Sequence, residues 1–276
     1  MLDLVDGFTG TAIVRRGDLE IVVDLCELGS GPAVLVLHGV EGVAADQEFL
    51  QALAMNFSVL APSHPGFGLS PRPDWLDSVD DIVYSYLDWL EERRIPDLTV
   101  VGLQFGAWLA SEIAVRNVGL FSRLVLVDPV GIKVGGPTER EIVDMFAISR
   151  AELASRMYSA DRHRTDLSEL PIENVMHVAR NEEALALYGW EPYLHNPKLH
   201  RRLHRISSPS LVLWGEEDGI TSQTYARKFA DLIQGSRFQT IPAAGHVSQV
   251  DQPEQVADLI RQFMAAPESV IAGSRQ

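Results

Sequence analysis

The chain has 276 residues and a net charge of −15, with 46% hydrophobic and 22% charged residues. This ordinary globular composition excludes a disordered or collagen-like chain. The acidic charge argues against nucleic acid and anionic membranes as partners, and the apolar runs are far shorter than the ~20 residues that span a bilayer.

The N-terminal stretch and the single cysteine bear on the compartment. Residues 1–10 contain two Asp, no Lys or Arg and no long apolar run, so no secretory signal is predicted. Cys26, the only cysteine, excludes an internal disulfide and is typical of a reducing compartment. Because it continues a strand-like run, we expect a buried, inert thiol in a cytoplasmic protein.

Short apolar runs alternate with helical patterns through the first half of the chain. The first two runs, 12–14 and 20–25, flank the turn-like Arg16-Gly17-Asp18 and predict an antiparallel pair. Further buried strands are predicted at 33–37, 58–61, 98–101 and 124–127. Helices are predicted at 47–55, 78–93 and 105–115, the second opened by a capping box of Ser78 and Asp81. This alternation predicts a parallel sheet with right-handed crossovers.

The pattern changes between residues 137 and 205, where strand-like runs vanish and helical patterns dominate. This segment holds eleven acidic and ten basic residues, so nearly all of the net charge lies on the rest of the chain. We predict a helical cap at 137–205, inserted between core segments 1–136 and 206–276. Strands are predicted again at 210–214 and 238–241, and helices at 222–232 and 253–264, the last with Pro in its first turn.

Several loops follow predicted strands at their C-terminal ends, where open parallel sheets bind ligands. In chain order they contain His38-Gly39-Val40-Glu41-Gly42, Pro65-Gly66-Phe67-Gly68, Gly102-Leu103-Gln104-Phe105-Gly106, Trp214-Gly215-Glu216-Glu217-Asp218 and Ala244-Gly245-His246. With these motifs in this order, the chain resembles the α/β-hydrolase superfamily over nearly its whole length. The Pro-Gly-Phe-Gly loop and the insertion are similar to the capped branch of esterases, lactonases and carbon–carbon bond hydrolases.

The resemblance implies an α/β fold with an eight-stranded, mostly parallel sheet flanked by helices and an inserted helical lid. It also implies a site. The family's order is nucleophile, acid, histidine, which makes Asp218 the orienting acid and His246 the general base. The amides of Val40 and Phe105 match the donors of the oxyanion hole. Asp128 is an alternative acid, but a turn residue before a proline is the favoured interpretation.

The sequence departs from the family at the nucleophile. The elbow motif is Gly-x-Ser-x-Gly, and here Gly102 and Gly106 frame Gln104. An amide has no hydroxyl, thiol or carboxylate, so it cannot form an acyl-enzyme. The other serines near these loops lack the elbow context, and we expect them to be loop or cap residues: Ser63, Ser70 and Ser248.

Four further residues are candidates for the substrate pocket: His38, Gly39, Glu41 and Trp190. We expect His38 to brace its loop, and a solvated acid is the favoured interpretation of Glu41. Three histidines lie in a strongly basic setting that repels cations, so neither a metal nor another cofactor is expected: His195, His200 and His204.

The chemistry implied for such a site is addition to the carbonyl of an ester, lactone or vinylogous diketone. A first interpretation is an enzyme in which the His246–Asp218 dyad activates water or takes a proton without a covalent intermediate. The alternatives are a serine hydrolase inactivated by replacement with Gln104, a non-catalytic binding protein, and a misaligned elbow. Because both residues of the dyad are retained, catalysis or a recent loss of the serine is favoured over a long-established binding protein. A small-molecule substrate is the expected partner, and a homodimer is left open.

Overall fold

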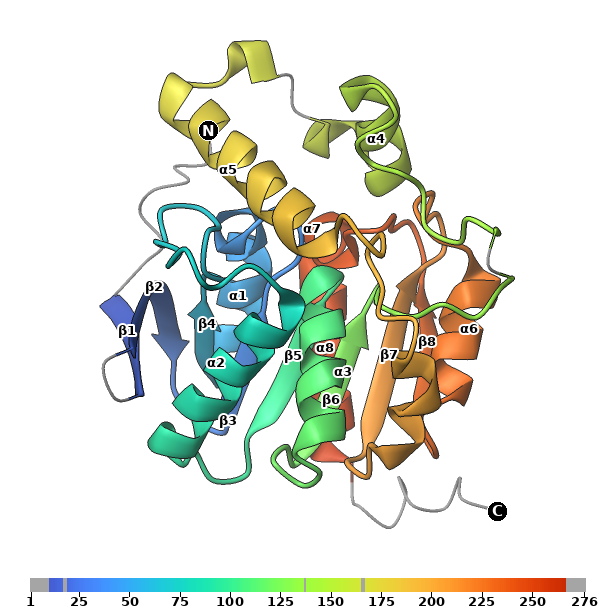
Figure 1. The fold of residues 1–276 in the computed structure, drawn as a ribbon. Helices are drawn as coiled ribbons and strands as arrows, with labels where there is room; N and C mark the ends of the chain where they lie inside the picture. The colour runs from blue at the N-terminus through green and yellow to red at the C-terminus, as the bar shows by residue number, and fades with distance from the viewer. Residues whose placement is uncertain (1–9, 17–18, 137, 165–166, 267–276) are drawn as a thin grey trace.

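The computed structural model describes residues 10–16, 19–136, 138–164 and 167–266. The turn residues Gly17 and Asp18, nearly all of the N-terminal stretch and Pro137 lie outside the described residues. Within the described part, Figure 1 shows a central sheet with helices on both faces and two further helices, α4 (Arg150–Met157) and α5 (Ile172–Gly189), beyond one end of the sheet.

One eight-stranded sheet runs through the described residues in the order β1-β2-β4-β3-β5-β6-β7-β8. β1 pairs with β2, and β2 with β4, in antiparallel fashion, and the remaining neighbours are parallel. The strands are β1 Gly10–Arg16, β2 Leu19–Gly29, β3 Ala33–Leu37, β4 Ser58–Pro62, β5 Thr99–Leu103, β6 Arg123–Val127, β7 Ser210–Gly215 and β8 Arg237–Ile241. The predicted α/β fold with a mostly parallel sheet is confirmed.

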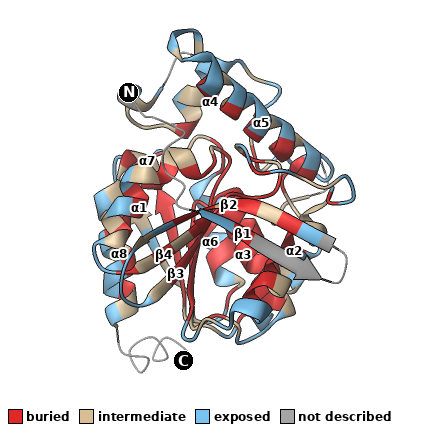
Figure 2. Ribbon diagram, turned by 90° about the vertical axis from the view of Figure 1, so that its left-hand side faces the viewer, coloured by how far each residue is buried: buried red, intermediate tan, exposed pale blue. Residues whose placement is uncertain are grey.

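Helices cover both faces because neighbouring residues of each central strand point to opposite sides. In β3, Leu35 and Leu37 join the core under α2 and α3, whereas Val34 and Val36 join the core under α1 and α8. Figure 2 shows that buried residues line the central strands and the inner faces of the helices. The helices are α1 Gln47–Ala54, α2 Val79–Arg93, α3 Phe105–Arg116, α4 Arg150–Met157, α5 Ile172–Gly189, α6 Gln223–Asp231, α7 Ser248–Asp251 and α8 Pro253–Ala265.

Local signals set several helix ends as the sequence predicts. Ser78 caps α2 by accepting from the Asp81 amide at 3.2 Å, and Asp81 Oδ2 accepts from the Ser78 amide at 3.1 Å. Pro253 stands at the first position of α8. The four-residue helix α7 was not predicted, because it is short, partly polar and without helical periodicity.

The inserted segment contains α4, α5 and four 3-10 turns among its described residues, and no strand. Isolated bridges join Gly131 to His195 and Ile142 to Thr221, so the insertion contacts the loop after β6 and the residues that follow the acid loop. Among the described residues, no helix combines the length and the apolar character needed to cross a membrane.

Candidate active site

Gln104 sits on a sharp turn between β5 and α3. Its backbone has φ 44° and ψ −103°, a strained conformation for a residue with a side chain. A Cβ at Gly102 would lie 2.5 Å from the Ala107 Cα, and one at Gly106 only 2.0 Å from the Leu37 carbonyl oxygen. The two framing glycines are therefore required by close backbone approach.

Asp218 and His246 come from the loops after β7 and β8 and meet at the C-terminal edge of the sheet. Asp218 Oδ2 lies 2.9 Å from His246 Nδ1. The other oxygen of Asp218 accepts from the amides of Ile220 and Thr221 at 2.8 and 3.0 Å, and the Thr221 hydroxyl donates to Oδ2 at 2.9 Å. Burial opposes protonation of His246, but the charge and hydrogen bond of Asp218 outweigh it and raise the pKa of the imidazole.

Asp128 is fully buried, and its φ of 47° places it in the turn before Pro129. Its two carboxylate oxygens accept from the amides of Gly215 at 2.8 Å and Ser248 at 3.0 Å, which joins three loops at the sheet edge. Burial and the nearby charge of Asp218 raise the pKa of Asp128 to about 7. Its hydrogen bonds go to backbone amides, while Asp218 holds the histidine.

The Gln104 side chain pairs with a residue that sequence reasoning missed. Gln104 Nε2 donates to Gln249 Oε1 at 3.0 Å, and Gln249 Nε2 donates to Asp46 Oδ1 at 2.9 Å. Gln249 lies on α7, directly after the histidine loop, and Asp46 ends the 3-10 turn Val43–Asp46 that follows the first loop. No described hydrogen bond joins Gln104 to His246.

The first loop lies against the elbow. A Cβ at Gly39 would stand 1.9 Å from Gln104 Oε1, so the carboxamide packs directly on this glycine. His38 braces the loop, because its Nε2 accepts from the His64 amide at 2.8 Å and the two rings stack at 3.7 Å. Burial lowers the pKa of His38 to about 4, so the imidazole stays neutral. Val40 is the next residue along this loop, and Phe105 is the first residue of α3.

Glu41 is half-buried, and the expectation of a solvated acid is wrong. Burial raises the pKa of its carboxyl, and the Tyr158 side chain, at the end of α4, hydrogen bonds to it. The Glu41 carbonyl accepts from Asn181 Nδ2 on α5 at 2.8 Å. Glu41 therefore connects the first loop to the insertion.

The insertion is fastened to the site loops at two places. On one side, Asn181 bonds to the Glu41 carbonyl and its Oδ1 accepts from the Gly68 amide at 2.8 Å. On the other, the Ser159 amide donates to Asp251 at 2.8 Å, and Asp251 also accepts from the Gly245 amide at 2.8 Å. Both halves of the site thus contact the inserted helices.

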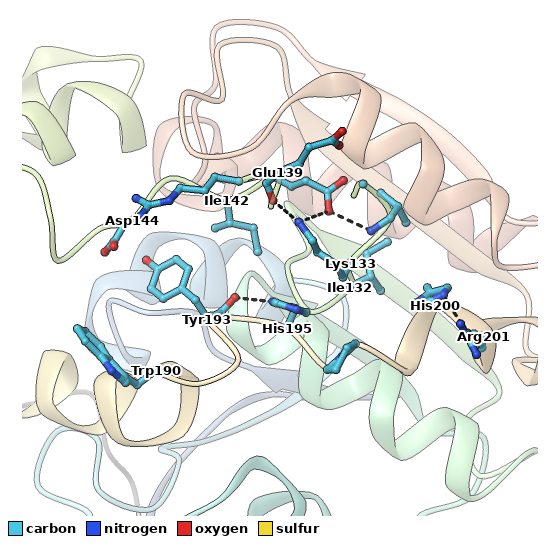
Figure 3. Close-up of a pocket in the computed structure, with 15 residues that line it drawn as sticks. Ile132, Lys133, Glu139, Ile142, Asp144, Trp190, Tyr193, His195, His200 and Arg201 are labelled. Carbon is cyan, nitrogen blue, oxygen red and sulfur yellow. Dashed lines mark hydrogen bonds and ion pairs between the residues drawn. The ribbon is translucent and has the colours of Figure 1, made fainter. Parts of the chain in front are cut away.

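The remaining candidates lie elsewhere or have structural partners. Trp190 is 58% exposed and lines a separate cavity of about 840 Å³, which Figure 3 shows together with His195 and His200. The lining of this cavity includes neither Gln104 nor the dyad. No group of three or more metal-ligating side chains occurs among the described residues. The serines bond locally: Ser63 and Ser248 donate to the carbonyls of Phe67 and Gly245, and Ser70 accepts from the Asp24 amide.

Comparison with known proteins places this geometry in a family. The model of the alpha/beta hydrolase family matches residues 34–259. A 2-hydroxymuconate semialdehyde hydrolase of Pseudomonas sp. (strain CF600) is 26% identical, over 93% of this chain and 94% of its own length. A 2-hydroxy-6-oxo-6-(2'-aminophenyl)hexa-2,4-dienoic acid hydrolase of Metapseudomonas resinovorans is 23% identical, over 87% and 86%. The solved structure of a meta-cleavage product hydrolase from Pseudomonas fluorescens IP01 superposes with a TM-score of 0.76 at 18% identity, over 94% of this chain and 98% of that one.

Proposed function

The chain belongs to the alpha/beta hydrolase family, and on that premise we propose that it acts on a small carbonyl compound without a covalent intermediate. The substrate class is an ester, a lactone or a vinylogous diketone. In this proposal the His246–Asp218 dyad is the base, and the amides of Val40 and Phe105 stabilise the oxyanion, with the Gln104 carboxamide helping to hold the substrate.

The proposed hydrolysis needs water as its only co-reactant. His246 Nε2 takes a proton from water, and the oxygen of that water forms a bond to the substrate carbonyl carbon. The carbonyl electron pair moves to its oxygen and is held by the two amides. When the tetrahedral adduct collapses, the bond to the leaving group breaks and the imidazolium returns its proton to that group. Asp218 stabilises the imidazolium throughout.

The observation that carries the proposal is the direction in which Gln104 bonds. Its amide donates to Gln249 rather than to His246, while His246 Nδ1 is 2.9 Å from Asp218. The Nε2 atom of the base is thus left for water or substrate. The names of two relatives, which describe hydrolases of a semialdehyde and of an oxo-dienoic acid, support a carbonyl substrate. We further propose that the 137–205 insertion caps this cleft, supported by its hydrogen bonds to loops on both sides of it.

The test is a panel of esters, lactones and vinylogous diketones assayed with the wild type, Gln104→Ser and His246→Ala. We expect the wild type to turn over at least one compound, and His246→Ala to lose that turnover. Gln104→Ser should gain activity on p-nitrophenyl acetate but turn over the native substrate more slowly. A silent wild type with an active Gln104→Ser variant would instead indicate an inactivated serine hydrolase. Silence in both, with normal folding, would indicate a binding protein.

A further inference from the structure

Three buried side chains from distant parts of the sequence form one hydrogen-bonded chain beneath the elbow. Asp46, Gln249 and Gln104 are 2%, 1% and 0% exposed. The bonds run from Gln104 Nε2 to Gln249 Oε1 at 3.0 Å and from Gln249 Nε2 to Asp46 Oδ1 at 2.9 Å, with a longer contact of 3.4 Å from Gln249 Nε2 back to Gln104 Oε1. Neither Asp46 nor Gln249 has a role in the proposed reaction so far.

The acid at the end of this chain fixes the direction of both amides. An ionised carboxylate only accepts hydrogen bonds, whereas a carboxamide has a donor end and an acceptor end. Gln249 must therefore turn its NH2 group to Asp46, which leaves its oxygen for Gln104. Gln104 must then turn its NH2 group to Gln249, and its own oxygen lies against Gly39.

We propose that Asp46 is a positioning residue that sets the orientation of the Gln104 carboxamide through Gln249. In the orientation it imposes, an acceptor oxygen faces the first loop, where the opposite orientation would present an NH2 donor. An acceptor at this place can hold a water molecule by one of its protons, whereas a donor would bind the water through its oxygen. This role deepens the proposed function and rests on it for its effect on turnover, but not for its effect on Gln104 itself.

The surroundings of Asp46 give this device a proton dependence. Asp46 Oδ2 is buried and has no hydrogen-bond partner among the described residues. Burial and the charge of Glu41 raise the pKa of Asp46 to about 7, although the hydrogen bond from Gln249 lowers it. The Tyr158 hydroxyl from the insertion and Asp251 from α7 are the other titratable groups on this side, and Glu48 on α1 is exposed. A protonated Asp46 carboxyl can also donate a hydrogen bond, so it no longer fixes the orientation of the Gln249 and Gln104 carboxamides.

The experiment follows the side-chain NH2 signals of Gln104 and Gln249 in proton–nitrogen NMR spectra between pH 5.5 and 8.5. The Gln104 signals are assigned by their loss in Gln104→Ser, and those of Gln249 by their loss in Gln249→Leu. In the wild type, both pairs should shift together with one midpoint near the pKa of Asp46, about 7. Asp46→Asn should abolish the shift, and the exposed Glu48→Gln should leave it unchanged. Gln249→Leu should also free the Gln104 signals from the titration, so the result does not rest on one variant.

Persistence of the Gln104 titration in Asp46→Asn would overturn the proposal and assign the shift to His246 or Asp128. Activity gives a separate arm. Asp46→Asn should lower kcat on the native substrate about tenfold, which corresponds to about 1.4 kcal/mol. In the Gln104→Ser background, Asp46→Asn should alter the esterase kcat less than about twofold, because the shorter serine side chain does not hydrogen bond to Gln249. An inert wild type would refute the proposed function but leave the NMR outcome to decide the role of Asp46.

Discussion

The two halves of the candidate site differ in how completely their carboxylates are hydrogen bonded. On the dyad side, every carboxylate oxygen of Asp128 and Asp218 has at least one donor, and most of these donors are backbone amides. On the elbow side, Asp46 has one oxygen without a partner in the described structure, and its other oxygen is held by a side-chain amide. The Glu41 carboxyl has its side-chain hydrogen bond from Tyr158 of the insertion.

This difference indicates which half keeps its geometry without a serine at position 104. Fully satisfied polar networks hold their members in one geometry, and partly satisfied ones leave alternatives of similar energy. The dyad is oriented by its own loops, independently of the residue at position 104. The elbow half is oriented by side chains that reach across from α7 and the first loop. We therefore expect changes in the dyad half to abolish chemistry, and changes in the elbow half to redirect it.

The largest effect is expected from His246→Ala, which removes the proposed base. Turnover of the native substrate should fall about 10²- to 10⁴-fold, the usual contribution of a positioned base. Steady-state kinetics with His204→Ala, an exposed histidine, as the control provide the measurement. Retained turnover in His246→Ala would move the chemistry away from the dyad half.

Asp251→Ala tests how firmly the dyad half is bound to the insertion. The change leaves the buried amides of Gly245 and Ser159 without their acceptor. Loss of such a buried, charge-assisted contact should lower the free energy of unfolding by about 2–4 kcal/mol. Urea denaturation measures this, with the exposed Asp258→Ala as the control. A loss no greater than in the control would mean that the insertion is only loosely attached there.

Gly39→Ala probes the packing of the elbow half. The added methyl group would meet Gln104 Oε1 at 1.9 Å, which should cost about 1–3 kcal/mol of stability. In Gln104→Ser the obstructing oxygen is gone, so the same substitution should cost less. Denaturation of the two single variants and the double variant gives the coupling between the positions. Additive losses would show that the carboxamide does not rest on this glycine.

The smallest effect, taken per pH unit, concerns the pH dependence of stability. The folded pKa of Asp46 is about 7, above its ordinary value of 3.8. Between these values the folded state keeps a proton that the unfolded state has released, so this group makes the protein less stable as pH rises toward 7. The slope is at most about 1.4 kcal/mol per pH unit. Asp46→Asn should remove it, and denaturation at pH 5, 6, 7 and 8 provides the comparison; an unchanged slope would contradict the raised pKa.

Site residues in short local motifs could be predicted from the sequence, whereas those that depend on contacts between distant segments could not. Gly102, Gly106, Asp218 and His246 lie in short motifs at strand ends, where the local sequence alone indicates their environment. Gln249 gives no such signal, because its partner Asp46 is 203 residues away and α7 has no periodicity. The contact of Glu41 with Tyr158 also joins separate segments, so a charged loop residue next to glycine gave no sign of burial.

The insertion is hydrogen bonded to the site loops at two separate places. A segment held at one end swings on a single hinge, but this one bonds to Gly68 and Glu41 through α5 and to Asp251 and Gly219 beyond α4. In the proposed arrangement, in which the insertion caps the site, release of the α5 bonds would uncover the elbow side and release of the α4 bonds would uncover the histidine side. On that proposal, the slower of the two releases would limit the turnover rate. Amide hydrogen exchange at Gly68 and Ser159 reports each release independently.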